Sequence, residues 1–278
     1  MADRLAALLD HFSITARIFN TSALCGITDV ASNESVGQLH LIRRGEVEVI
    51  NSSGITVKIT EPSLLLYPLP MAHRFVTDPN SGADFVCANL SFEGGRNNPI
   101  AASLPNFIYL PLSALQSAGH ILEILFQEAS AQYCGRTAML NRLMEVLLIQ
   151  ILRQLMEEGS VRVGMLAGMA HPRLRLALVA MHENPAQDWS LEELAEQAGM
   201  SRSVFANAFR DCVGCTPGVY LQRWRINLAQ RSLLEGRPVK WIADTVGYGS
   251  EAAFSRAFKV SCGLSPRQWY AEQQAAAA

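Results

Sequence analysis

Short apolar runs separated by turn residues fill the first part of the chain, between residues 37 and 111. Residues 38–42 and 46–50 are two such runs of strand length, and a third, at 57–60, follows an Asn-Ser-Ser-Gly turn. Strand-sized runs rich in β-branched residues and punctuated by Gly, Pro and Asn are typical of small all-β folds. This part of the chain is therefore predicted to form a β-sandwich or barrel.

The hydrophobic period changes after residue 119, where apolar positions recur three and four residues apart. That spacing predicts an amphipathic helix over residues 140–155 and an antiparallel partner helix over residues 120–133. These helices either cover the β domain or meet a second subunit, and packing on the β domain is slightly favoured. The apolar face of the longer helix consists of Leu140, Leu143, Met144, Leu147, Leu148, Ile151, Leu152 and Leu155.

A glycine-containing stretch without clear periodicity, residues 159–171, separates these elements from the rest of the chain. Such a composition is typical of a linker. The chain is therefore predicted to be of the α+β class with two domains. Residues 1–158 form a β domain with two appended helices, and residues 172–278 form an all-helical domain.

The helical part contains an internal repeat, in which residues 194–201 resemble residues 242–250 at an offset of 48 that becomes 49 after one insertion. Each copy has a short helix, a glycine that ends it, a serine cap and a second helix with two aromatic residues. This order predicts two helix-turn-helix units, and their duplication favours DNA binding over two purely structural hairpins. Aromatic residues expected in the core are Phe205, Phe209, Phe254, Phe258 and Trp241.

Basic charge is concentrated in the same region. The whole chain has a formal net charge of −2, whereas residues 201–270 contain ten basic and four acidic residues, a net charge of +6. This asymmetry is expected of a nucleic-acid module joined to an acidic domain, and clustering on solvated helix faces is the alternative. Six irregularly spaced cysteines, with no visible secretory signal or membrane-length apolar run, predict a reducing, cytoplasmic setting without membrane contact.

These residues together resemble the AraC-type (AraC/XylS) transcription regulators, over about residues 173–270. The resemblance implies a long helix over residues 217–234 that sets two recognition helices about one DNA turn apart, so that both enter successive major grooves. The implied partners are double-stranded promoter DNA and RNA polymerase. The signature consists of Ala195, Gly199, Met200, Ser201, Phe205, Phe209, Gly214, Cys215, Thr216, Pro217 and Tyr220, then Ile242, Ala243, Gly247, Tyr248, Phe254, Phe258, Lys259, Gly263, Leu264, Ser265 and Pro266.

By position, the resemblance assigns groove-facing roles to seven side chains. Arg256 can bond guanine O6 and N7, and Asn207 can pair with adenine, each worth about 1–3 kcal/mol of base discrimination. Glu251 can accept from a cytosine amino group, or it repels phosphate. Ser201 and Ser250, at helix N-termini, are better placed for phosphate oxygens. The seven residues are Ser203, Ala206, Asn207 and Arg210 in the first helix, and Glu251, Ala252 and Arg256 in the second.

The β domain resembles a degenerate cupin, a small jelly-roll barrel whose histidines line a pocket. The resemblance rests on Pro68 and His73, spaced P-x4-H after an apolar run, and on His40 in an earlier strand. It implies a metal ion held by His40 and His73, with Cys25 and Cys87 as candidates for the missing ligands, because a bound metal needs three or four. The alternative is that each histidine is a hydrogen-bonded core residue.

Within the AraC type, the N-terminal half resembles regulators whose cupin-like sensor responds to reactive chlorine or related electrophiles. That resemblance implies a redox switch in which oxidation joins Cys25 to Cys87, with a nearby imidazolium lowering the thiol pKa. The disulfide would close a loop of about 62 residues, worth roughly 4 kcal/mol of chain entropy. The alternative is that Cys87 is a buried small hydrophobe and Cys25 an idle loop thiol.

The predicted function is therefore sequence-specific regulation of transcription, as an activator, under the control of the cupin-like domain. Control by cysteine oxidation, by a small organic ligand or by a metal stays open, as does a homodimeric state. The chain is predicted not to be an enzyme, because the motifs GxSxG, GxxxxGK[ST] and HExxH are absent from the sequence. A cupin-type metalloenzyme is the least favoured alternative. Cys212 and Cys215 form a single CxxC that is expected to be structural.

Overall fold

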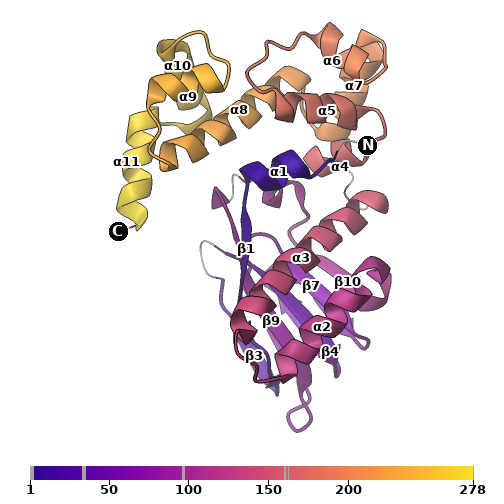
Figure 1. Cartoon of the computed structure of the whole chain (residues 1–278). Helices are drawn as coiled ribbons and strands as arrows, with labels where there is room; N and C mark the ends of the chain where they lie inside the picture. The colour runs from indigo at the N-terminus through magenta and orange to yellow at the C-terminus, as the bar shows by residue number, and fades with distance from the viewer. Residues whose placement is uncertain (1–2, 33–35, 96–97, 160, 162, 278) are drawn as a thin grey trace. The chain divides into compact units, whose positions relative to one another are not determined.

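The computed structural model describes residues 3–32, 36–95, 98–159, 161 and 163–277. The chain divides into two units: Ser13–Val161 is one, and Arg162–Ala278 together with Met1–Phe12 is the other. Figure 1 draws the strands in the first unit and shows the second unit as a set of helices.

The first unit is built from two antiparallel sheets. One sheet has the order β1-β9-β4-β7-β10, with β2 also paired to β9, and the other has the order β3-β8-β5-β6. The predicted strands form β4 to β6, which confirms the β domain, whereas β1 to β3 precede the predicted region. The strands are β1 (Ile14–Asn20), β2 (Ala23–Leu24), β3 (Ile27–Val30), β4 (Gly37–Arg44), β5 (Val47–Asn51), β6 (Thr56–Ile59), β7 (Ser63–Tyr67), β8 (His73–Thr77), β9 (Ala83–Phe92) and β10 (Ile108–Pro111).

Apolar side chains from both sheets form the core of this unit. Strands β4, β7 and β9 have neighbours on both edges and are largely buried on both faces, which explains their nearly continuous apolar sequences. Phe75 of β8 and Phe85 of β9 meet between the sheets, with ring centroids 4.9 Å apart. The core cluster consists of Ile42, Val47, Val49, Ile59, Leu65, Tyr67, Phe75, Ala83, Phe85 and Cys87.

Two helices, α2 (Gly119–Ser130) and α3 (Arg136–Glu157), pack against each other beside the larger sheet (Figure 1). They correspond to the two helices predicted from the 3.6-residue period. The backbone of β1, an edge strand, donates hydrogen bonds to Glu145 and Asn141 of α3, at 3.1 and 2.9 Å. Because these bonds occupy donors that an edge strand otherwise exposes, α3 protects that edge of the sheet.

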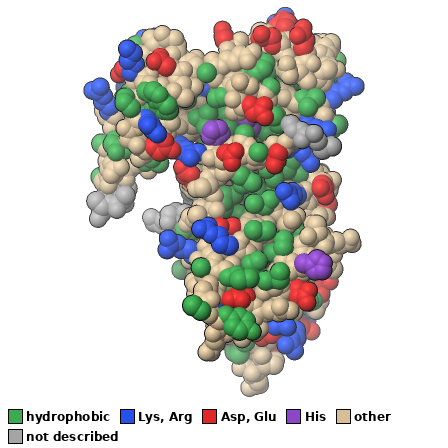
Figure 2. Space-filling model, viewed as in Figure 1, with side chains coloured by type: hydrophobic (Ala, Val, Ile, Leu, Met, Phe, Trp, Pro, Cys, Tyr) green, Lys and Arg blue, Asp and Glu red, His purple; other side chains and the backbone are tan. Residues whose placement is uncertain are grey.

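The outer surface of α2 and α3 keeps apolar side chains, which gather over these helices in Figure 2. The prediction that these helices meet a second subunit stays a prediction. The exposed apolar side chains are Ile124, Tyr133, Met139 and Val146.

The second unit is helical, and its longest helix, α8, lies between two smaller groups of helices (Figure 1). The bounds of α8 coincide with those of the predicted spacer helix. The helices of this unit are α1 (Ala6–His11), α4 (Met165–Ala170), α5 (Leu174–Glu183), α6 (Leu191–Gln197), α7 (Arg202–Val213), α8 (Pro217–Leu234), α9 (Val239–Thr245), α10 (Glu251–Cys262) and α11 (Pro266–Ala277).

The domain boundaries differ from the predicted ones in two places. Residues 165–170 of the predicted linker form α4, whose side chains are mostly buried, and Gly168 packs so tightly that a Cβ there would lie 2.6 Å from Leu178. Residues 3–12, predicted to belong to the β domain, pack on the helical unit instead. Phe12 is buried against Trp224, with ring centroids 5.2 Å apart, and Arg231 donates a hydrogen bond to the Asp10 carbonyl.

Candidate nucleic-acid interface

The first helix-turn-helix consists of α6 and α7. A capping box begins α6: the Ser190 hydroxyl accepts a hydrogen bond from the Glu193 N–H, and the Glu193 carboxylate accepts one from the Ser190 N–H. Gly199 then turns the chain with φ +61°, a conformation that favours glycine. Phe205 and Phe209, four residues apart on α7, are fully buried and hold this helix on the rest of the unit.

The second helix-turn-helix, α9 and α10, repeats this plan with the expected aromatic anchors, Phe254 and Phe258, fully buried. The two serine caps differ from each other. The Ser250 hydroxyl accepts a hydrogen bond from the Ala253 N–H at 3.2 Å, as predicted. Ser201 occupies the equivalent position with extended backbone, but its side chain makes no capping hydrogen bond to any residue that the structure describes.

The predicted groove-facing residues of α7 lie opposite its buried phenylalanines. Ser203, Asn207 and Arg210 are exposed and follow one another at three- and four-residue steps, and Ala206 beside them is half-buried. The Arg210 guanidinium donates a hydrogen bond of 3.3 Å to the Asn207 side-chain oxygen. The structure therefore brings the four predicted residues of the first helix together on one face.

Helix α10 presents a corresponding face, with Glu251, Ala252 and Arg256 all exposed. Lys259 is exposed on the same side, at the position that Arg210 has in α7. The interpretation of the sequence missed Lys259 as a site residue, although the offset of 49 residues between the repeats points from Arg210 directly to it. The second face therefore offers two cations.

Helix α8 separates the two helix-turn-helix units. It begins at Pro217, after Thr216 whose hydroxyl accepts a hydrogen bond from the Val219 N–H, and it continues for 18 residues. At 1.5 Å per residue its length is ~27 Å. Buried side chains such as Trp224, which is 2% exposed, line much of its length, so α8 is packed against the unit as a structural spacer.

Trp241 was expected in the core, and this expectation was wrong. Its side chain is 46% exposed at the start of α9, and the Arg237 guanidinium lies over its ring, 5.3 Å from the centroid. The core of the second helix-turn-helix is filled instead by the next two residues of α9, Ile242 and Ala243, which are fully buried. Trp241 therefore lies on the surface beside basic residues.

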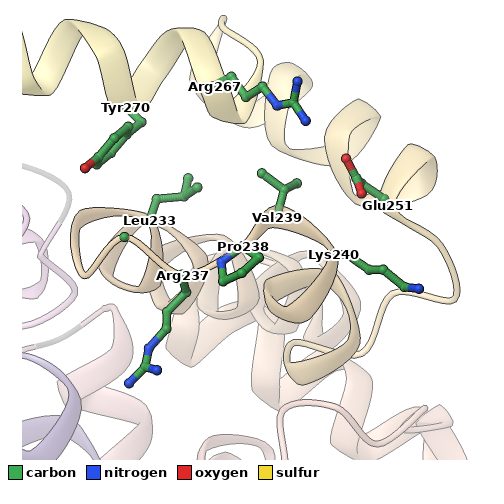
Figure 3. Close-up of a pocket in the computed structure, with 9 residues that line it drawn as sticks. Leu233, Arg237, Pro238, Val239, Lys240, Glu251, Arg267 and Tyr270 are labelled. Atoms are coloured by element: carbon green, nitrogen blue, oxygen red, sulfur yellow. The ribbon is translucent and has the colours of Figure 1, made fainter.

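A pocket of about 410 Å³ adjoins the second helix-turn-helix, between the start of α9 and helix α11. Figure 3 shows Val239 and Leu233 on one side of it and Tyr270 and Arg267, from α11, on the other. Lys240 and Arg267 add positive charge near the start of α10. The basic charge predicted from composition thus continues beyond the recognition helices themselves.

Two buried histidines of the β unit, which is the unit Ser13–Val161, are hydrogen-bonded to each other. His73 donates from Nδ1 to the Met71 carbonyl at 2.9 Å, so its Nε2 accepts from Nε2 of His40 at 3.1 Å. Burial, and then the neighbouring His73, hold the pKa of His40 well below its ordinary value, and burial lowers the pKa of His73. Tyr67 stacks on His73 and donates to the Asn51 side-chain oxygen at 2.6 Å. Both imidazoles are therefore neutral.

These residues do not fit a metal ion. The described residues contain no group of three histidine, cysteine or acidic side chains placed to hold one. The two imidazole nitrogens that would bind a metal are hydrogen-bonded to each other. Cys87, directly opposite His40 across β4 and β9, is a thiol whose pKa burial raises to about 12, and Cys25 is exposed. The histidines act here as the hydrogen-bonded core residues of the alternative interpretation.

Cys25 and Cys87 lie apart in this structure. Cys25 follows β2 and places its sulfur beside Gly82, at the start of β9, where a Cβ would lie 2.5 Å from it. Cys87 lies five residues beyond Gly82 along β9, roughly 16 Å away at about 3.3 Å per residue. A disulfide needs Cα atoms within about 7 Å. The structure thus does not bring the predicted redox pair together, and burial disfavours the reactive thiolate at Cys87.

Comparisons with known proteins agree with this architecture. A cupin family model matches residues 3–157, and a helix-turn-helix domain model matches residues 194–272. The transcriptional regulator AlkR of Acinetobacter baylyi is 30% identical over 265 residues, which cover 83% of this chain and 86% of AlkR. The chain belongs to the AraC-like helix-turn-helix regulators.

Two further relatives show how far the likeness extends. An AraC-like regulator of Streptomyces antibioticus is 40% identical over 180 residues, and this chain spans only 59% of that relative's length. The RCS-specific transcriptional activator RclR of Escherichia coli is 29% identical over 244 residues, covering 86% of both chains. The family and the two-domain fold predicted from the sequence are therefore confirmed. Among the described residues no helix is long and apolar enough to cross a bilayer.

Proposed function

We propose that the chain is a sequence-specific activator of transcription that binds promoter DNA through α7 and α10. The observation that carries the proposal is the pair of helix-turn-helix units with exposed polar faces, joined by α8. The ~27 Å length of α8 is close to the repeat of B-DNA, about 34 Å, so one side of a duplex can meet both helices. Binding to promoter DNA implies a cytoplasmic protein and contact with RNA polymerase.

The side chains divide by the contacts that they can make. Arg256 has the forked guanidinium that recognises guanine, and Asn207 has the amide that pairs with adenine. Ala206 and Ala252 can touch only a thymine methyl group. Residues with a hydroxyl or a cation near the groove edges position the protein on phosphates without reading sequence. The residues proposed to contact phosphate are Ser201, Ser203, Arg210, Ser250 and Lys259. Glu251 can accept a hydrogen bond from a cytosine amino group, and its carboxylate repels a nearby phosphate.

The proposal is tested by selecting duplexes from a random-sequence library with the wild-type chain and repeating the selection with variants. Arg256→Ala is expected to lose preference at one base pair, with affinity for the selected duplex falling about 5- to 150-fold, equivalent to 1–3 kcal/mol. Lys259→Ala is expected to weaken binding evenly across sequences and to reduce the salt dependence by roughly one ion. Arg223→Ala, on the exposed side of α8, removes the same charge as a control.

Two results would contradict the proposal. One is a wild-type chain that enriches no sequence. The other is an Arg256→Ala variant that selects the same motif as the wild type with unchanged affinity. A loss of affinity that is equal for Arg223→Ala and Arg256→Ala would assign the effect to total charge and would also count against base recognition.

The β unit is proposed to control DNA binding by taking up a small polar effector. The support is its buried polar cluster, where Nδ1 of His40 and Nδ2 of Asn51 have no hydrogen-bond partner in the described part of the chain. Unpaired buried polar atoms cost about 1–3 kcal/mol each, which a ligand that bonds to them would offset. A thermal-shift screen with and without reductant tests this, because stabilisation that depends on oxidant instead of ligand would restore the redox alternative.

A further inference from the structure

One arginine of α8 contacts both halves of the helical unit. Arg225 lies half-buried near the middle of α8 and donates from Nε to the Pro185 carbonyl at 2.6 Å and from Nη2 to the Gln187 carbonyl at 2.8 Å. Its Nη1 donates to the Gly247 carbonyl at 3.4 Å. The guanidinium also lies over the Tyr248 ring, 5.8 Å from the centroid.

These partners come from different helix-turn-helix units. The carbonyls of Pro185 and Gln187 belong to the loop before α6, in the first unit, whereas Gly247 and Tyr248 form the turn between α9 and α10, in the second. A planar guanidinium with five N–H groups can make these bonds at once, and an amine cannot reproduce their fork geometry. Arg225 is thus a bridge between the two units that is separate from the covalent connection through α8.

The two loops also touch directly. Gly247 has φ +82°, and a Cβ on it would lie 2.5 Å from the Ala186 carbonyl oxygen. No side chain larger than hydrogen fits between the turn of the second unit and the loop of the first. Together with Arg225, this close approach joins the two units on one side of α8.

We propose that Arg225 is a positioning residue that holds α7 and α10 in the relative orientation needed to bind two half-sites at one fixed spacing. The inference rests on the proposed function. A helix alone fixes the distance between its ends, whereas the rotation of each unit depends on what packs against it. The Arg225 bridge therefore determines spacing selectivity, and it contributes little to contact with either half-site alone.

The test uses the full chain and the duplex that the wild type selects from a random library, together with versions of that duplex carrying one base pair more or fewer between the half-sites. Wild type is expected to bind the selected spacing best. Arg225→Ala should reduce that preference about tenfold, equivalent to about 1.4 kcal/mol. Its affinity for a duplex with a single half-site should stay within about twofold of wild type. Arg225→Lys should recover only part of the preference.

The controls separate positioning from general damage. Arg223→Ala removes the same charge from an exposed site on α8 and should keep the wild-type spacing preference. Gly247→Ala should reduce the spacing preference as Arg225→Ala does, because the added methyl group pushes the turn at Gly247 away from the loop at Ala186. A spacing preference retained in Arg225→Ala would overturn the inference, whatever Gly247→Ala does. A loss of single-site affinity as large as the loss of spacing preference would overturn it as well. If Arg225→Ala does not fold, Arg225→Lys decides by the same criteria. A wild-type chain that selects no duplex refutes the proposed function itself.

Discussion

His182 makes the stability of the helical unit depend on acid. Its ring, on α5, is 1% exposed, stacks on Trp224 with centroids 3.9 Å apart, and has Nε2 at 2.6 Å from the Tyr220 hydroxyl. Burial, and then the nearby His11, lower the pKa of His182 to about 3. The folded unit therefore keeps this imidazole neutral at pH values where the unfolded chain protonates it.

The size of the effect follows from the two pKa values. In the unfolded chain His182 binds a proton near 6.5, and in the folded unit only near 3. The contribution of neutral His182 to the free energy of unfolding is fully present above pH 6.5 and is lost as pH falls towards 3. In that range the unfolded state binds more protons than the folded state. The slope reaches about 1.4 kcal/mol per pH unit, and the loss between pH 7.5 and 5.5 is about 1.4 kcal/mol.

Tryptophan fluorescence isolates this unit, since the four tryptophans all lie between residues 189 and 269. Urea unfolding at pH 7.5, 6.5 and 5.5 gives the free energy of unfolding for wild type and for His182→Gln, which cannot titrate. The variant starts less stable, so the compared quantity is the change with pH. Wild type should lose about 1.4 kcal/mol more than the variant over this range. Parallel pH dependences of the two proteins would refute the assignment of the acid sensitivity to His182.

Two further predictions concern thiols and helix caps. Iodoacetamide should label the exposed Cys25 in the native protein, whereas Cys87, a thiol whose pKa burial raises to about 12, should react only after unfolding. Labelling is followed by mass spectrometry, and equal rates for the two cysteines in the native protein would contradict this prediction. Ser250→Ala should lower the free energy of unfolding by about 1 kcal/mol, since it removes a capping hydrogen bond, whereas Ser201→Ala should cost much less. Equal losses in urea unfolding would contradict that difference.

The helix-turn-helix part was predictable because its signals are local. The glycine turns and the aromatic pairs lie within short windows of sequence, and their repetition located α7 and α10. The bounds of α8 came from the resemblance to the AraC-type regulators. The offset of 49 residues between the two repeats also maps Arg210 onto Lys259, so a stricter comparison of the repeats finds Lys259. Local periodicity therefore suffices where each element packs mainly on its sequence neighbours.

The parts that the sequence analysis missed depend on distant contacts. Helix α4 is six residues long and rich in alanine, glycine and methionine, and only its burial among the other helices distinguishes it from a linker. Phe12 is an apolar residue near the N-terminus, and nothing in its local sequence indicates that its ring packs against Trp224, more than 200 positions away. The distance between Cys25 and Cys87 likewise depends on the register of β2 on β9, which short turns do not reveal.

The two recognition faces are not equivalent. On α7, Arg202 pairs with Glu192 at 3.0 Å and Arg210 is bonded to Asn207, so a base or phosphate must replace existing contacts there. On α10, Arg256 and Lys259 form no ion pair with any residue that the structure describes, and both are exposed. Exposed cations without partners bind phosphate at lower cost, because no intramolecular contact is lost. Helix α10 is therefore expected to provide the larger share of the electrostatic attraction to DNA. Helix α7 is expected to add base selectivity through Asn207.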